Sequence, residues 1–258
     1  MQLLYKMASR SAWIARRFAK SNLHGKQKVL RSCSYVPAFR GEVKSQGDVR
    51  KNEHALQILH LNCSGSDDRS WTGIGSETFF KSYKKIYPHH KIKEINLWDK
   101  DLLKYNLSHV ASKMRMVSGE EQAGDKENLT AVEDMITTLY SADKLVISSP
   151  MWNYGVPYVL KQYIDCIVQP GLTFQETQNG PRGLVTGRPL LLITSSGGDY
   201  TKPGMVHLDF QVPYLKVIFA LIGFTNVRHI YIKNTSHDKR EHLLQLIYKS
   251  VSHEVKQF

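Results

Sequence analysis

Short apolar runs alternate with longer helical patterns from residue 55 onward, and this alternation restricts the fold more than any other feature of the sequence. The runs that have the length of β-strands occupy 56–61, 92–97, 145–149, 189–194 and 230–232 with its neighbours. The first, third and fourth runs are almost continuously apolar, which is typical of strands covered on both faces. Strands that alternate with helices form a parallel sheet with helices on either side. We therefore expect one α/β domain over residues 55–258.

The segments between these runs carry helical patterns, at 76–87, 128–141, 156–168, 213–222 and 239–255. Ser76 is predicted to cap the first helix, and the third is predicted to begin near Pro157 because proline is favoured at the first helical position. Residues 99–125 are polar and irregular, with room for short helices or a mobile flap. Five strands in this rhythm predict a flavodoxin-like, doubly wound sheet with the order 2-1-3-4-5.

The net charge of +12 is unevenly distributed. Residues 1–41 hold nine Lys and Arg and no Asp or Glu, so positions 42–258 keep 26 basic and 23 acidic residues, a net charge of +3. A nucleic-acid-binding domain needs a concentrated basic surface, which this nearly balanced body does not favour. No run of about 18 apolar residues is present, so no membrane span is expected.

Residues 1–41 have the composition of a mitochondrial transit peptide. The segment is rich in Arg and Ser, and on a helical wheel its apolar side chains lie opposite its basic ones. It lacks the continuous apolar centre of a secretory signal. The prediction is import into the mitochondrial matrix, with 42–54 as a polar linker. A disordered basic tail on a cytoplasmic protein is the alternative.

The chain contains three cysteines, Cys33, Cys63 and Cys166. They form no CxxC pair and no His-rich cluster with metal-ligand spacing, so no metal site is expected. A sparse, odd set of cysteines fits unpaired thiols in a reducing compartment.

Ligands of a doubly wound sheet bind beyond the carboxyl ends of the strands, where the winding direction reverses. The loop after the first predicted strand is rich in Ser and Gly and includes Ser64, Gly75 and Ser76. Backbone N–H groups and partial positive charge at a helix start favour an anion such as a terminal phosphate. The segment lacks the Gly-Lys-Ser/Thr of a P-loop, and an ordinary loop is the alternative.

The loop after the third predicted strand is unusually rich in aromatic residues. Pro150 can end the strand because it has no N–H for the ladder. It is followed by Met151, Trp152, Asn153 and Tyr154. A flavin's isoalloxazine ring requires apolar contacts on its faces and hydrogen bonds along its polar edge, and this loop offers both. Plain core packing or a dimer contact is the alternative.

The loop after the fourth predicted strand contains Ser195, Ser196, Gly197 and Gly198. Paired glycines allow a ligand to approach the backbone closely, and the hydroxyls can bond its edge. A simple turn is the alternative. The three loops follow strands one, three and four, so we expect them to converge on one binding site.

Several short motifs occur in a fixed order. They are PMWNY at 150–154, GLTF at 171–174, NGPRGL at 179–184, TG at 186–187, TSSGG at 194–198 and LIGF at 221–224. With these motifs, the chain from about 56 to 255 resembles the FMN-dependent NADH:quinone oxidoreductases, or azoreductases, of the flavodoxin-like fold.

The resemblance implies a homodimer with one non-covalent FMN in each subunit. The implied cofactor contacts are Ser64, Gly75 and Ser76 for the phosphate, Met151, Trp152, Asn153 and Tyr154 for the ring, and Ser195, Ser196, Gly197 and Gly198 for the ring's other polar end. Two departures from the family pattern stand out. The first loop is longer by residues 67–69, and the family's Ser-x-Ser aligns with Ile74-Gly75-Ser76, where one hydroxyl is lost.

The resemblance also implies a ping-pong reaction in which NADH or NADPH delivers hydride to FMN and a quinone or azo compound then takes the electrons. FMN carries the chemistry, so no catalytic side chain is expected. Phe174, Tyr154 and Trp152 are predicted to form the slot for planar substrates. A flavodoxin-type electron-transfer protein and a flavin-free regulatory relative are the alternatives, and the sequence leaves NADH against NADPH open.

Overall fold

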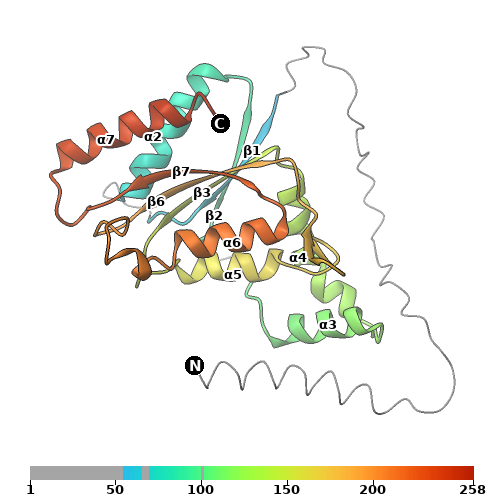
Figure 1. Ribbon diagram of the computed structural model, residues 1–258. Coiled ribbons are helices and arrows are strands. Elements are labelled where there is room, and N and C mark those ends of the chain that lie inside the picture. Colours follow the sequence, from blue (N-terminus) through green and yellow to red (C-terminus); the bar gives the residue numbers. More distant parts are fainter. Residues whose placement is uncertain (1–54, 66–69, 100–101) are drawn as a thin grey trace. The chain divides into compact units, whose positions relative to one another are not determined.

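A five-stranded parallel sheet forms the centre of the computed structural model, which describes residues 55–65, 70–99 and 102–258 (Figure 1). Its strands are β1 (Gln57–Asn62), β2 (Lys91–Asn96), β3 (Lys144–Pro150), β6 (Pro189–Ser195) and β7 (Asn226–Ile232). Their spatial order is β2-β1-β3-β6-β7, which confirms the predicted order of a flavodoxin-like sheet. The predicted leader 1–41 and linker 42–54 lie outside the described residues.

Helices cover both faces of the sheet (Figure 1). One face is covered by α2 (Trp71–Ile86) and α7 (Arg240–Glu254), and the other by α4 (Asp125–Tyr140), α5 (Tyr158–Ile167) and α6 (Val212–Ile222). A short 3-10 helix, η1 (Val206–Leu208), precedes α6. The polar stretch 99–125, for which short helices or a flap were expected, contains α3 (Leu107–Ser118), which packs on α4. None of the helices in the described ranges is long and apolar enough to cross a membrane.

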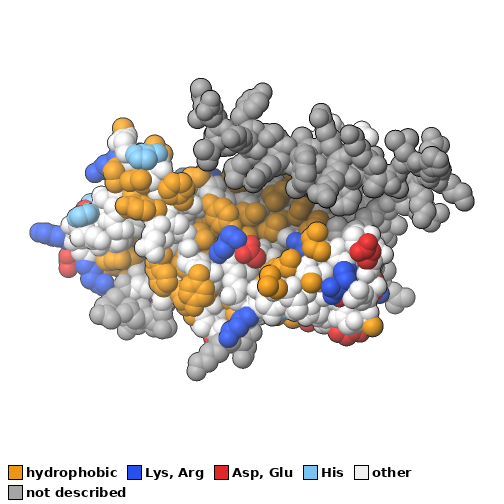
Figure 2. Space-filling model, turned by 90° about the horizontal axis from the view of Figure 1, so that it is seen from below, with side chains coloured by type: hydrophobic (Ala, Val, Ile, Leu, Met, Phe, Trp, Pro, Cys, Tyr) orange, Lys and Arg blue, Asp and Glu red, His pale blue; other side chains and the backbone are white. Residues whose placement is uncertain are grey.

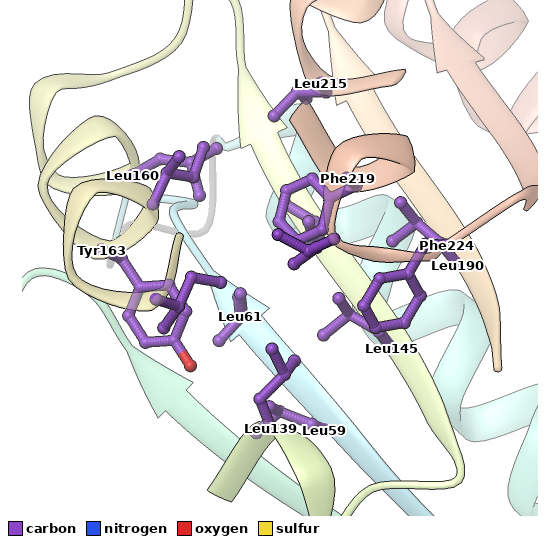
Figure 3. Packing of buried hydrophobic residues seen from close by; sticks show 14 of the residues in the cluster. Leu59, Leu61, Leu139, Leu145, Leu160, Tyr163, Leu190, Leu215, Phe219 and Phe224 are labelled. Carbon is purple, nitrogen blue, oxygen red and sulfur yellow. The ribbon is translucent and has the colours of Figure 1, made fainter. Parts of the chain in front are cut away.

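The strands direct alternate side chains into two buried clusters, one on each face of the sheet. Leu59 and Leu61 of β1 pack with α4, α5 and α6, as Figure 3 shows for residues such as Leu160 and Phe219. Ile58 faces the opposite way, toward α2 and α7. Full burial of one such aliphatic side chain contributes about 1.5–3 kcal/mol, so this alternation fixes which helices cover each face.

Helix α2 begins five residues earlier than the sequence predicted. Its N-cap is Ser70, whose hydroxyl accepts a hydrogen bond from the Gly73 N–H at 3.2 Å. The prediction that Ser76 caps the helix was therefore wrong. The glycines suggested a loop, but a Cβ on Gly75 would lie 2.7 Å from Ile232 Cδ1, so this glycine allows α2 to approach the sheet closely. Pro157, predicted near the first helical position, is the N-cap of α5.

A small antiparallel hairpin was not predicted. It consists of β4 (Phe174–Thr177) and β5 (Gly180–Gly183), which lie between α5 and β6 in the chain. The hairpin packs directly on the end of α6, since a Cβ on Gly183 would come within 2.5 Å of Gly223 Cα. Phe174 therefore lies beyond the C-terminal end of α5.

Candidate functional site

The loops after β3 and β6 are joined at the carboxyl edge of the sheet. The Met151 N–H donates to the Ser195 carbonyl at 2.7 Å, which continues the pairing of the two parallel strands by one residue. The predicted ring-binding residues of both loops are thus brought to one place. This is the edge at which a doubly wound sheet binds its ligands.

A tight turn presents two unpaired N–H groups at this edge. Trp152 and Gly155 exchange backbone hydrogen bonds of 3.0 and 2.9 Å. Between them, Asn153 and Tyr154 have φ angles of 49° and 66°. Left-handed backbone is uncommon for Tyr, and such conformations cluster at ligand sites. Within the described part of the chain, the N–H groups of Asn153 and Tyr154 find no acceptor, so both can donate to a bound molecule.

The loop after β6 is held by β7 and presents a second group of donors. The Ser196 hydroxyl lies 2.6 Å from the Tyr231 hydroxyl and donates to the Gly198 carbonyl at 2.8 Å, so its side chain is already engaged. The N–H groups of Gly197, Gly198 and Asp199 have no acceptor among the residues that the structure describes. Three consecutive free donors suit the carbonyl-rich edge of a planar ligand.

Asp199 anchors this loop electrostatically. Its burial opposes ionisation, but hydrogen bonds from Lys233 at 2.8 Å and from Thr201 outweigh that effect and lower the pKa of Asp199 to about 2. The carboxylate is therefore charged at neutral pH and holds Lys233 beside the loop.

Gln211, just before α6, is a site residue that the sequence did not reveal. Its side chain is buried, and Nε2 donates to the carbonyls of Pro150 at 2.7 Å and Ser149 at 3.2 Å. Its Oε1 is buried without a partner in the described structure. An unmatched buried acceptor beside the end of β3 fits a polar donor of a bound molecule, because leaving it unpaired is costly. No local pattern marks Gln211, since its partners lie about 60 residues away.

Two hydroxyls lie at the start of α2, where a phosphate was predicted to bind. The Ser70 and Thr72 hydroxyls are 3.2 Å apart in the first turn, and Ser64 is buried in the preceding loop. Gly75 and Ser76 lie one turn further on, where helical N–H groups already donate to carbonyls four residues back. Ser70-Trp71-Thr72 thus has the Ser-x-Thr pattern with two hydroxyls that is absent from Ile74-Gly75-Ser76.

The predicted slot residues separate into different aromatic groups. The Trp152 ring lies 5.2 Å from Trp98, whose own ring is 5.7 Å from Tyr158. Tyr154 instead meets Tyr200 at 5.8 Å. A cavity of about 650 Å³ next to Trp152 is lined by α5 and Tyr105 but not by Phe174.

Trp98 follows β2, so the rule that ligands bind beyond the strand ends would have identified it. Its indole N–H donates to the Cys63 carbonyl at 2.9 Å, which fixes the ring. Phe174 follows the C-terminal end of α5 and is not among the residues that line this cavity.

No cluster of three or more His, Cys, Asp or Glu with the arrangement of a metal site occurs among the described residues. Cys63 and Cys166 are free thiols in the core, and burial raises the pKa of the Cys166 thiol to about 12. Such a thiol is unreactive at neutral pH.

Proteins of known family share the fold of this chain. The family model described as flavodoxin-like fold matches residues 57–251. The FMN-dependent NADH:quinone oxidoreductase of Nitratidesulfovibrio vulgaris is 34% identical over 180 residues, 69% of this chain and 86% of that protein. A relative of the same name from Bradyrhizobium diazoefficiens is 34% identical over 70% of this chain and 88% of its own. An FMN-dependent NADH-azoreductase from Bacillus anthracis, solved with FMN, has a TM-score of 0.72 at 25% identity, covering 78% of this chain and 98% of its own.

Proposed function

Because this chain belongs to the flavodoxin-like fold family that contains the FMN-dependent NADH:quinone oxidoreductases, we propose that it binds FMN and uses NADH or NADPH to reduce quinones or azo compounds. The observation that carries the proposal is the pair of donor groups at the carboxyl edge of the sheet. Asn153 and Tyr154 offer free N–H groups on one side, and residues 197–199 offer three on the other.

The residues present fit an FMN. The turn at 152–155 would hold the polar edge of the ring, and the loop after β6 its other polar end. The buried acceptor of Gln211 would receive a donor at the end of β3. The start of α2, with Ser64, Ser70 and Thr72, would hold the phosphate, since helix N-termini favour anions.

Bound FMN supplies the redox chemistry by accepting hydride from NAD(P)H and passing two electrons to the acceptor. The protein's own part is to orient and to shield. Trp98, held by its bond to the Cys63 carbonyl, offers with Trp152 and Tyr158 a planar apolar surface on which a nicotinamide or quinone ring can stack. Both substrates then use one slot in turn, which is the structural basis of a ping-pong reaction.

Steady-state kinetics test this proposal. Full-length protein with FMN should turn over many times with NADH and a small quinone, and double-reciprocal plots at several quinone concentrations should be parallel. Intersecting lines would contradict a shared slot. If the protein did not turn over repeatedly with a small quinone and required a protein acceptor, the flavodoxin-type alternative would be supported.

The same kinetics with NADPH in place of NADH measure the nucleotide preference.

We further propose that two copies of the chain form a homodimer, as the family resemblance implies. Large apolar side chains are exposed on α3, α5 and α6, and Figure 2 shows broad hydrophobic areas on the face seen from below. They include Leu107, Met114, Tyr158 and Val217. Exposed apolar areas of this kind are typical of protein interfaces. Phe174, which does not line the cavity of its own chain, would contribute to the slot of a second copy.

Sedimentation of the wild-type protein and of Val217→Lys tests the dimer. The wild-type protein should sediment as a dimer at micromolar concentration, and a charge at this position, 70% exposed, should shift it toward monomer without unfolding it. A fully active wild-type monomer would contradict the proposal.

For residues 1–41 the proposal is mitochondrial targeting, supported by their acid-free, Arg-rich composition. The named relatives are bacterial and offer no parallel. A fluorescent reporter fused to residues 1–41 should enter mitochondria, and a matched fusion with its arginines changed to glutamine should not. A diffuse signal from the unaltered fusion would contradict targeting.

A further inference from the structure

A buried chain of polar groups connects β1, β2 and β3 behind the loop that carries Ser64. The His60 imidazole lies at its centre, with Nδ1 2.9 Å from Glu94 Oε2 and Nε2 2.8 Å from Ser148 Oγ. Ser148 Oγ also lies 3.1 Å from Asn62 Oδ1 and 3.3 Å from Ser64 Oγ. His60, Ser148 and Ser64 are buried, whereas about half of the Glu94 side chain is exposed. We call these five residues the His60 network.

The backbone fixes the direction of the hydrogen bonds in the His60 network. The Ser64 N–H donates to Asn62 Oδ1 at 2.8 Å, so that oxygen is an acceptor, and Asn62 Nδ2 donates to Glu94 Oε1 at 3.0 Å. The contact between Ser148 Oγ and Asn62 Oδ1 therefore uses the one proton of the Ser148 hydroxyl. Ser148 Oγ can then only accept from His60, so His60 Nε2 carries a hydrogen.

A second proton lies between His60 Nδ1 and Glu94. Without it, a lone pair of the ring nitrogen would face a carboxylate oxygen at 2.9 Å. The hydrogen bond with His60 lowers the pKa of Glu94 to about 2, which keeps the carboxyl ionised and leaves the proton on the ring. Hydrogens on both nitrogens would make His60 an imidazolium.

Among the charged groups near His60, Glu94 is the one that can pair with a positively charged imidazole. The charged groups that line a cavity of about 500 Å³ together with His60 are Glu77, Lys81 and Lys84 of α2 and Glu94 of β2. Glu77 and Lys81 neutralise one another at 2.5 Å, and Lys84 donates to the carbonyls of Pro88 and His90. The Phe80 ring of α2, 4.7 Å from the imidazole, covers His60 on the side of this helix.

We propose that His60 and Glu94 form a partly buried ion pair whose protons orient Ser148 and Asn62, and that this pair positions Ser64 for a ligand phosphate. The inference rests on the proposed function in one respect, which is that the bound phosphate belongs to FMN. In this proposal His60 acts on a bound phosphate through Ser148 and Asn62, so it is a positioning residue. If Nε2 loses its proton, Ser148 must donate to His60 instead. Ser148 Oγ and Asn62 Oδ1 then face one another without a proton, and the support of the Ser64 N–H is lost. Phosphate affinity should therefore fall as pH rises.

Nitrogen-15 NMR of the protein without FMN tests the ion pair itself. Both ring nitrogens of His60, assigned through the backbone, should give signals of protonated nitrogen at neutral pH. His229 is an internal control, because burial lowers its pKa to about 4 and its Nε2 faces only the Thr194 hydroxyl, at 2.7 Å. It should show one protonated and one bare nitrogen. If His60 also showed one protonated and one bare nitrogen, the proposal would be overturned. This result does not depend on whether FMN binds.

Cofactor binding tests the positioning role. Dissociation constants of FMN and of riboflavin, which lacks the phosphate, would be measured from about pH 5 to pH 9, the range around the ordinary histidine pKa. The preference for FMN should fall about tenfold with rising pH in the wild-type protein, as expected for loss of one charge-assisted hydrogen bond. In His60→Gln, the preference for FMN over riboflavin should not fall with rising pH, because the glutamine amide can donate to Ser148 but does not titrate.

His242→Gln, at an exposed position of α7, is the matched control and should retain the wild-type profile. Equal profiles for wild type and His60→Gln would overturn the positioning role. A protein that binds neither flavin would contradict the proposed function, while the NMR result still decides whether the ion pair exists.

Discussion

At the scale of single residues, Asn153 and Tyr154 have a left-handed backbone conformation, and their N–H groups are the proposed donors to the ligand. A left-handed residue other than glycine is held there only when the surrounding structure over-determines it. Here the paired hydrogen bonds between Trp152 and Gly155 do so. The conformation turns two N–H groups away from the chain, where a ligand can accept them.

Replacing Asn153 tests the importance of this conformation. Asn153→Gly tolerates the φ of 49°, whereas Asn153→Ala does not, and both variants lack the amide side chain. We expect the alanine variant to be about 1 kcal/mol less stable than the glycine variant and to bind FMN more weakly. Urea unfolding and flavin fluorescence measure the two effects. Equal stability of the two variants would mean that the turn adopts another conformation in solution.

At the scale of elements, much of the fold follows from local patterns. All five strands of the sheet lie within a few residues of their predicted positions, because each is a short run of apolar or alternating residues separated from the next by a longer segment. The start of α2 was not predictable locally, since Gly73 and Gly75 favour a loop, and the small size of Gly75 is required by Ile193 and Ile232 of distant strands. Gln211 and His60 were missed because their roles depend on partners from distant segments.

The cap of α2 yields a prediction about the phosphate. Ser70→Ala should destabilise the protein by about 1 kcal/mol, because the Gly73 N–H loses its acceptor. It should also reduce the preference for FMN over riboflavin more than Ser76→Ala does, since the Ser76 hydroxyl donates to the Gly73 carbonyl within the helix. Binding of the two flavins by both variants is the measurement. A larger effect at Ser76 would restore the assignment made from sequence.

The contact of α2 with the sheet yields a second prediction. Gly75→Ala brings a Cβ to 2.7 Å from Ile232 Cδ1, whereas Ile232→Val removes that atom. In the wild type, the clash opposes the better helix propensity of Ala. The change in unfolding free energy caused by Gly75→Ala should therefore be more favourable in the Ile232→Val background than in the wild type, by at least about 0.5 kcal/mol. A double-mutant cycle of unfolding free energies measures the coupling. A coupling free energy of zero would mean that residue 75 of α2 does not contact Ile232.

At the scale of the whole molecule, hydrogen-bonded carboxylates contribute to how stability depends on pH. Hydrogen bonds from His60 and Asn62 lower the pKa of Glu94 to about 2, and those from Lys233 and Thr201 do the same for Asp199 despite its burial. A carboxyl whose pKa is lower in the folded state stabilises that state above its unfolded pKa, and this contribution is lost as pH falls toward the folded value.

The free energy of unfolding should therefore fall between about pH 4.5 and pH 2. The fall should be less steep in Glu94→Gln, because one of these carboxyls no longer titrates. Thermal unfolding at a series of pH values measures both slopes. Identical slopes for the two proteins would show that Glu94 titrates alike in the folded and unfolded states.

The proposed function requires a flavin bound at the carboxyl edge of the sheet, where the loops after β3 and β6 are joined. An absorbance titration under argon tests this claim most directly. Full-length protein loaded with FMN should lose the absorbance of oxidised flavin when NADH or NADPH is added, and recover it when a quinone follows. A protein that retains no FMN, or whose bound FMN stays oxidised with both nucleotides, would contradict the account.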